Sequence, residues 1–130
     1  LQVNKEQQGT SPSIWLVFGC GGDRDSGKRA LMGSVAARGA DHVVLTSDNP
    51  RSEDPAAIIA GIRGGMSRAP AACIVDRSEA INWVIANAQD GDTIVIAGKG
   101  HETYQEILGQ RLPCSDVALV EQALMKVSLC

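Results

Sequence analysis

Aromatic side chains are scarce in this chain, making up 3% of its 130 residues. Proteins that bind single-stranded nucleic acids stack the bases on aromatic rings, so this composition disfavours that class. A basic excess is also lacking, because 12 Lys and Arg residues face 15 Asp and Glu residues, for a net charge of -3. The composition therefore gives no sign of a nucleic-acid-binding surface.

Long hydrophobic runs and a secretory leader are absent from the sequence as well. No apolar run approaches the length of a membrane span, and residues 1–5 do not have the pattern of a signal peptide. We therefore expect an intracellular protein that does not bind membranes. The first residue is Leu rather than Met, so the chain could be a piece of a longer protein.

The cysteines lack the close pairing of a structural metal site. The four residues are scattered, with no C-x-x-C spacing, at Cys20, Cys73, Cys114 and Cys130. Neither a zinc site nor a disulfide framework is predicted from this spacing. We expect Cys73 to be buried in a strand and the others to be reduced thiols.

What the chain does contain is an alternation of apolar runs and helical patterns. Hydrophobic residues make up 44% of it, enough for one domain with a core. Residues 1–13 are predicted to be a linker or the tail of a preceding helix, and residues 14–130 the domain. Strands are predicted at 14–18, 43–46, 73–75 and 93–97, and helices at 28–38, from 54–55 onward, at 78–89 and from 115 to about 126.

The alternation predicts an α/β fold. The expected architecture is Rossmann-like, a doubly wound and mostly parallel sheet with helices on both faces. Residues 104–112 are predicted to form a hairpin that adds an antiparallel edge. In the predicted helix at 28–38, the residues Leu31, Met32, Val35 and Ala36 recur at helical spacing.

The first predicted loop has the spacing of a phosphate-binding P-loop without its chemistry. Residues 22–28 follow G-x-x-x-x-G-K, but Arg29 stands where Ser or Thr would bind magnesium. Asp23 and Asp25 would also place negative charge beside the phosphates. The dinucleotide fingerprint fails too, because Arg24 occupies its last glycine position. We therefore expect no P-loop here.

The charges of this loop still suit a ligand. Asp23 or Asp25 could bind ribose hydroxyls, and Arg24 or Lys28 could meet a phosphate or a carboxylate. The alternative is a surface turn whose charges pair with one another.

The second loop, Asp48-Asn49-Pro50-Arg51, follows a predicted strand. In a parallel sheet such a loop lies at the carboxyl edge, where these folds bind ligands. Arg51 can hold a carboxylate through two hydrogen bonds, and Asp48 can pair with an ammonium group. Pro50 restricts the backbone of the loop. The alternative is an ordinary solvated turn.

The third loop, Gly98-Lys99-Gly100-His101-Glu102, also follows a predicted strand. Its glycines allow a ligand close to the backbone, Lys99 supplies a cation, and Glu102 could hold an ammonium group. His101 could bond a ligand or orient the loop. It has no evident Ser or Cys partner, so hydrolase chemistry is not predicted.

These motifs, at residues 18–25, 27–29, 48–51 and 98–102, resemble the carboxy-terminal domain of the Mur ligases over residues 14–124. The resemblance implies a cytoplasmic, ATP-dependent ligase of peptidoglycan synthesis. The implied ligase adds meso-diaminopimelate to UDP-N-acetylmuramoyl-L-alanyl-D-glutamate through an acyl phosphate. In the family, ATP and Mg²⁺ are bound mainly by a central domain that this chain lacks, and the UDP-linked dipeptide is bound by the missing domains. Within the family, the tetrapeptide at 48–51 is the hallmark of diaminopimelate rather than lysine as substrate.

The resemblance also assigns site residues. Diaminopimelate contacts are implied for Arg24, Asp48, Asn49, Arg51, Gly98 and Glu102, and nucleotide contacts for Asp23 and Lys28. The two arginines would face carboxylates and Glu102 the distal ammonium, whereas no catalytic residue or metal ligand is carried over. Lysine lacks the second carboxylate, so Arg51 would be left unpaired.

One departure from the family pattern lies at Asp116-Val117-Ala118, where relatives tend to have Asp-Arg-Glu. Two alternative functions stay open. One is a lysine-adding ligase of the same family, and the other is a free-standing α/β module that binds an anionic metabolite.

Overall fold

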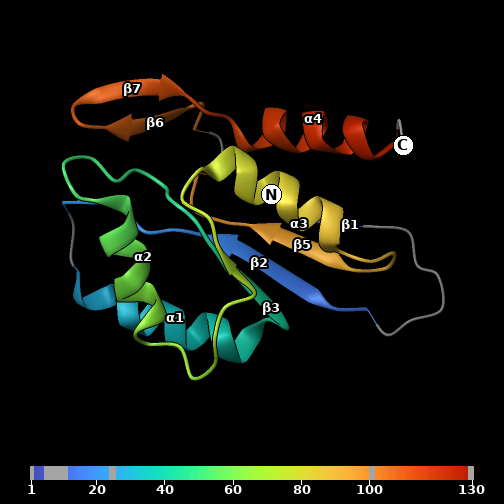
Figure 1. Ribbon diagram of the computed structural model, residues 1–130, viewed down its shortest axis with the longest axis horizontal. Helices are drawn as coiled ribbons and strands as arrows, with labels where there is room; N and C mark the ends of the chain where they lie inside the picture. The colour runs from blue at the N-terminus through green and yellow to red at the C-terminus, as the bar shows by residue number, and fades with distance from the viewer. Residues whose placement is uncertain (1, 5–11, 24–25, 100–101, 129–130) are drawn as a thin grey trace.

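A five-stranded, mostly parallel sheet lies at the centre of the protein (Figure 1). The computed structural model describes residues 2–4, 12–23, 26–99 and 102–128. The strand order is β1-β5-β2-β3-β4, and every pairing is parallel except that of β1 with β5. The strands are β1 (Gln2–Asn4), β2 (Ile14–Phe18), β3 (His42–Leu45), β4 (Ala72–Cys73) and β5 (Thr93–Ile96).

Helices cover both faces of this sheet, as the sequence predicted. Helices α1 (Gly27–Gly39) and α2 (Pro55–Arg63) lie on one face, and α3 (Arg77–Asn87) and α4 (Asp116–Ser128) lie on the other (Figure 1). Two starts are fixed by aspartate caps: Asp54 accepts a hydrogen bond from Ala56 N at 3.0 Å, and Asp76 from Glu79 N at 3.0 Å. These caps satisfy backbone donors that a helix start leaves free. The expected α/β class is confirmed.

Each strand places alternate side chains in two separate cores. In β2, Trp15 and Val17 pack toward α3 and α4, whereas Phe18 packs toward α1 and α2. The same division holds in β3, where Val44 faces one core and Leu45 the other. Because side chains alternate along a strand, this two-sided burial fixes the register and thereby the place of each strand end.

The buried face of α1 differs from the apolar face that the sequence suggested. Leu31, Met32 and Val35 are exposed, with 62%, 43% and 54% of their surface accessible. Of the four predicted residues only Ala36 is buried, and it is joined by Gly33 and Ala37. The exposed side chains line an apolar groove of about 580 Å³ together with Leu16, Phe18 and Val95 of the sheet.

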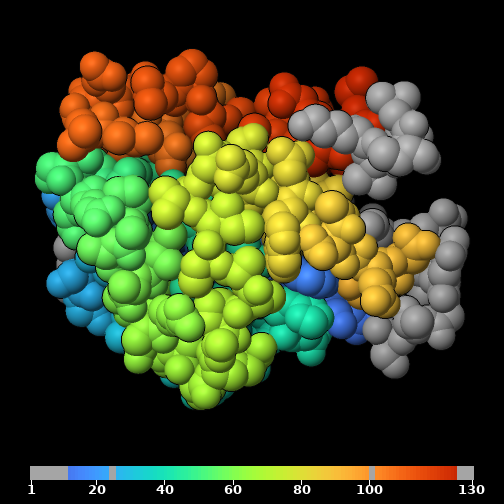
Figure 2. All heavy atoms as spheres, in the orientation of Figure 1, coloured from blue at the N-terminus to red at the C-terminus, as the bar shows by residue number. Residues whose placement is uncertain are grey.

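Two expected elements are placed differently from the prediction. Gln2–Asn4 were expected in a linker or helix tail, but they form β1 because the edge of β5 offers free backbone groups. The hairpin of β6 (Tyr104–Ile107) and β7 (Gln110–Pro113) forms, but as a separate sheet. It meets the rest of the protein through a bridge between Arg51 and Ile107. Figure 2 shows the orange hairpin lying against the green segment that follows β3.

The described cysteines, Cys20, Cys73 and Cys114, are free thiols. Cys73 is exposed, contrary to the prediction, because β4 is a two-residue strand at the edge of the sheet. Burial raises the pKa of the Cys20 and Cys114 thiols, which keeps them protonated and weakly nucleophilic. Over the described part of the chain, no helix has the length and apolar character that crossing a membrane requires.

Candidate functional site

The loops that follow β2 and β3 are in direct contact at the carboxyl edge of the sheet. Gly22 N donates a hydrogen bond to Asn49 O at 2.7 Å. A Cβ atom on Gly22 would lie 1.8 Å from Pro50 O, so only glycine permits this approach. The first loop is therefore seated on the Asp48–Arg51 loop, as expected from the parallel order of the strands.

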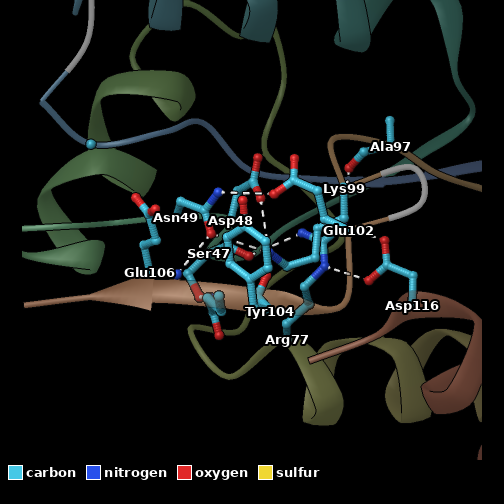
Figure 3. A network of polar contacts seen from close by, with 12 residues as sticks. Ser47, Asp48, Asn49, Arg77, Ala97, Lys99, Glu102, Tyr104, Glu106 and Asp116 are labelled. Atoms are coloured by element: carbon cyan, nitrogen blue, oxygen red, sulfur yellow. Dashed lines mark hydrogen bonds and ion pairs between the residues drawn. The ribbon is translucent and has the colours of Figure 1, made fainter. Parts of the chain in front are cut away.

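The loop that follows β5 joins them through a buried cation. The side chain of Lys99 is fully buried, and its Nζ donates to Asn49 Oδ1 at 3.2 Å and Tyr104 O at 2.7 Å (Figure 3). Asp48 Oδ1 lies 3.4 Å from the same Nζ. A buried ammonium group needs such compensation, since burying an unpaired charge costs several kcal/mol or more. Lys99, predicted as a free cation for a ligand, instead binds two loops together.

Asn49 connects this interior contact with the solvent side of the site. Its Oδ1 also accepts a hydrogen bond from Glu106 N at 2.9 Å, and its Nδ2 lies 3.4 Å from Glu102 Oε2. Asn49 is buried and Glu102 is half-buried. The amide group of Asn49 thus holds the hairpin and also contacts the half-buried carboxylate of Glu102.

Arg51 has a strained backbone that contacts with the hairpin stabilise. Its φ is 53°, in the left-handed region that residues other than glycine rarely adopt. Two hydrogen bonds to the hairpin hold it there, from Arg51 N to Glu106 O at 2.9 Å and from Leu108 N to Arg51 O at 2.8 Å. The hairpin therefore fixes the direction in which this side chain leaves the loop.

The guanidinium of Arg51 is already paired. Its Nε lies 2.9 Å from Glu106 Oε2, and its Nη1 donates to Gly22 O at 3.0 Å. The two charged side chains stay 23% and 26% exposed, so solvent and ligands can reach them. This pairing corrects the expectation that a substrate without a second carboxylate would leave Arg51 unpaired, because Glu106 would remain its partner.

A surface cavity of about 540 Å³ opens beside this ion pair. Its lining residues come from the first two loops and from the hairpin, and are Asp23, Arg51, Ser52, Glu106, Leu108, Gly109 and Arg111. Charges of both signs in one cavity suit a zwitterionic ligand better than an apolar one.

The two residues predicted to contact a nucleotide, Asp23 and Lys28, have different surroundings. The Asp23 carboxylate accepts hydrogen bonds from Ser52 Oγ at 2.6 Å and Ser52 N at 3.3 Å. Lys28 is exposed in the first turn of α1 and does not line the cavity. Arg24, Asp25, Gly100 and His101 lie outside the described residues. The structure therefore brings together Asp48, Asn49, Arg51, Gly98 and Glu102, with Asp23 at their border.

Arg29, the residue that breaks the P-loop pattern, has a structural role here. It is buried and makes two hydrogen bonds to Glu53, from Nη2 to Oε1 at 2.9 Å and from Nη1 to Oε2 at 3.0 Å. Glu53 Oε1 also accepts from Asp23 N at 2.7 Å. The hydrogen bond from Arg29 lowers the pKa of Glu53, which therefore stays ionised. This pair fixes the first loop where a P-loop would bind phosphate.

The described residues do not supply a metal site. Over residues 12–23, 26–99 and 102–125, no three His, Cys, Asp or Glu side chains are grouped to hold a metal ion. The donors near the loops are already paired, Asp48 with Lys99 and Glu106 with Arg51.

Comparisons with known proteins found similar sequences and a similar fold. The sequence model of one family, described as Mur ligase, glutamate ligase domain, matches residues 1–100. Two curated relatives are each named UDP-N-acetylmuramoyl-L-alanyl-D-glutamate–2,6-diaminopimelate ligase. The one from Chromobacterium violaceum is 55% identical over 111 residues, which cover 85% of this chain and 22% of the relative. The one from an Acidovorax species is 53% identical over 114 residues, which cover 87% and 23%.

A solved structure with the same ligase name is also similar. It has a TM-score of 0.85 and 52% sequence identity, over 91% of this chain and 25% of that chain. The chain thus spans only 22% to 25% of the length of these relatives.

Proposed function

Because the chain belongs to the Mur ligase family, we propose that the chain from β1 to α4 is the amino-acid-binding domain of a cytoplasmic ligase that adds meso-diaminopimelate to UDP-N-acetylmuramoyl-L-alanyl-D-glutamate. One observation carries the proposal. Arg51 and Glu102 are joined through Asn49 at the sheet edge where the three loops meet. Arg51 Nη1 donates to the backbone carbonyl of Asn49, and the side-chain amide of Asn49 donates to Glu102. A cation and an anion held by one buried residue suit the carboxylate and the ammonium at the distal end of diaminopimelate.

The residues have distinct roles in this proposal. Arg51 binds the distal carboxylate through its planar guanidinium, exchanging one carboxylate partner for another as Glu106 gives way. Glu102 binds the distal ammonium. Asp48 and the buried Asn49 hold the loop, and Gly98, which has a φ of 115° and no side chain, lets the substrate approach the backbone. Arg24 binds the other carboxylate.

The nucleotide belongs to the same proposal. Asp23 lies in the first loop and Lys28 in the first turn of α1. Both would face ATP, which the rest of the ligase would mainly bind. ATP supplies a phosphoryl group that activates the carboxylate of the UDP-linked dipeptide. The part played by this chain is to hold the amino acid so that its free amine can attack the carbonyl carbon of the resulting acyl phosphate. The amide bond forms there as the bond to the phosphate oxygen breaks and inorganic phosphate leaves. Correct placement of two reactants lowers the barrier without any catalytic side chain in this domain.

A hybrid enzyme tests the proposal. This chain would replace the matching segment of the Chromobacterium violaceum relative, and phosphate release would be measured with meso-diaminopimelate and with L-lysine. We expect turnover with diaminopimelate only. Replacing Arg51 with Ala should lower kcat/KM for diaminopimelate by about 10- to 100-fold, because a charged hydrogen bond contributes about 1.5–3 kcal/mol.

The matched control is Arg38→Ala, which removes an exposed arginine at the end of α1 whose side chain donates to Ser34 O of the same helix. This variant should keep the kcat/KM of the hybrid. A hybrid that uses lysine equally well, or an Arg51→Ala variant with unchanged kinetics, would contradict the proposed substrate.

A further inference from the structure

Arg77 is a buried arginine that links the starts of two substrate loops. It is the first residue of α3 and is 2% exposed. Its Nη1 donates to Ser47 O at 3.0 Å and its Nη2 to Ala97 O at 3.1 Å. Ser47 directly precedes Asp48, and Ala97 directly precedes Gly98. One guanidinium therefore sets the separation between the two loops.

Asp116 fixes the orientation of this guanidinium. Arg77 Nε donates to Asp116 Oδ1 at 2.7 Å, and Nη2 to Asp116 Oδ2 at 2.8 Å, with both side chains 1% exposed (Figure 3). Two parallel hydrogen bonds to a carboxylate determine the plane of the group as well as its position. Asp116 is the first residue of α4, so the pair joins α3 and α4 to the carboxyl edge of the sheet.

The electrostatic setting keeps this group charged. Burial alone would lower the pKa of Arg77, but the hydrogen bonds and charge of Asp116, and then the charge of Asp48, raise it overall. The charge of Arg77 also reaches Gly98, since a Cβ atom built on that glycine lies 3.9 Å from Nη2 and 3.1 Å from Asp48 Oδ2. The guanidinium thus lies beneath the point where the two loops meet.

We propose that Arg77, oriented by Asp116, is a positioning residue that sets the diaminopimelate affinity of the domain without touching the substrate. It acts through the carbonyl groups of Ser47 and Ala97, which place the residues that follow them. This inference rests on the proposed function. A lysine at position 77 would keep the charge but could not reach both carbonyls and both oxygens of Asp116 at once, because its three donors share one nitrogen.

The test uses Arg77→Lys in the hybrid ligase, with KM measured separately for diaminopimelate, ATP and the UDP-linked dipeptide. A displaced binding loop weakens binding steeply, so we expect KM for diaminopimelate to rise by about tenfold or more. The KM values for ATP and the UDP-linked dipeptide should stay within about twofold, because the rest of the ligase binds most of these two substrates. A general loss of folded enzyme would instead lower the apparent kcat without raising one KM alone.

Arg68→Lys is the matched control. Arg68 also bonds to backbone carbonyls, at 3.1 Å from Ala37 O and 2.9 Å from Asp41 O, but at the opposite edge of the sheet, before β3. This variant should leave all three KM values within about twofold.

Several outcomes would overturn the inference. One is a diaminopimelate KM that Arg77→Lys leaves unchanged, and another is a common rise of all three KM values. If Arg77→Lys does not fold, Asp116→Asn is judged by the same criterion. Loss of folding in both variants, with Arg68→Lys folded, would make the pair a folding element only. Failure of the proposed function looks different, because the unmodified hybrid would then show no preference for diaminopimelate.

Discussion

Replacing Glu106 with Gln should make the domain bind diaminopimelate more tightly. In the structure Glu106 occupies Nε of Arg51 at 2.9 Å, where the proposed function places the distal carboxylate of the substrate. The direction of Arg51 does not depend on this contact alone, since Gly22 O accepts from Nη1 at 3.0 Å. The backbone bond from Arg51 N to Glu106 O does not involve the replaced side chain either. Glutamine therefore removes a competing charge while the guanidinium keeps its place.

The size of the effect follows from the exposure of the pair. With 23% and 26% of the two side chains accessible, the ion pair is largely screened by water. Exposed pairs contribute about 0.2–1 kcal/mol, and about 1.4 kcal/mol corresponds to a tenfold change in affinity. The KM for diaminopimelate should accordingly fall by about 1.5- to fivefold. Arg111, whose Nε is 3.4 Å from Glu106 Oε1, would lose the same partner and add to the attraction for a carboxylate.

Steady-state phosphate release from the hybrid ligase measures this effect. The control Glu121→Gln makes the same change of charge at an exposed position of α4 and should leave KM as it is. In an Arg51→Ala background, Glu106→Gln should have a smaller effect on KM, because only Arg111 is then released from Glu106. A higher KM in the single variant would mean that Glu106 orients Arg51 rather than competing for it. The exchange of carboxylates proposed above would then be wrong.

Two further changes test the framework around the site. Asp92→Asn should lower the free energy of unfolding by about 2–4 kcal/mol at pH 7, as measured by urea denaturation followed by fluorescence. The buried Asp92 carboxylate accepts hydrogen bonds from Ser13 N at 2.8 Å and from Trp15 Nε1 and Gln89 N at 2.9 Å. An asparagine amide has only one oxygen, so it would leave at least one of these donors unpaired. Burial raises the pKa of Asp92, but these donors outweigh it and the net pKa is lowered. The stabilisation is therefore full above the unfolded carboxyl pKa of about 3.9 and is lost as the pH falls through the lower folded pKa. The difference in unfolding free energy between the unmodified protein and Asp92→Asn should shrink in acid. A difference that stays constant with pH would contradict this role of Asp92. Gly22→Ala should raise the diaminopimelate KM of the hybrid, because the added Cβ would overlap Pro50 O. The control Gly39→Ala, which has no atom within 4 Å of its Cβ, should leave this KM unchanged. Equal effects of the two changes would contradict the close packing of the first loop against the second.

The sheet was predictable because its information is local. The run at 14–18 has no polar residue, as expected of a strand buried on both faces, and it is β2. Asp54 followed by Pro55 predicted a helix start, and Asp54 caps α2. The buried face of α1 was less predictable, because the choice between its small and its large residues depends on how closely α2 approaches. The pairing of β1 with β5 joins residues about 90 positions apart, which no local pattern records.

The site was predictable in its loops but not in its partners. Strand ends and charged tetrapeptides marked Asp48, Arg51 and Glu102 because a parallel sheet brings its carboxyl ends to one edge. The partner of Arg51 is 55 residues away, and that of Arg77 is 39 residues away. Both depend on where the hairpin and α4 pack. A charged residue in the sequence gives its chemistry, but only the fold decides whether its partner is a ligand or another side chain.

This difference changes how the tetrapeptide at 48–51 should be understood. The carboxylate of Asp48 and the amide of Asn49 point toward Lys99 and the hairpin, whereas Arg51 stays accessible beside the cavity. If Arg51 alone meets the distal carboxylate, then the other two residues determine where it stands. Changing Arg51 would remove the contact with that carboxylate but would leave a loop shaped for it, with Glu106 left to its longer contact with Arg111. A carboxylate released from Arg51 would attract the ammonium group of lysine, so we expect acceptance of lysine to depend on the hairpin residue Glu106 as well as on the loss of Arg51.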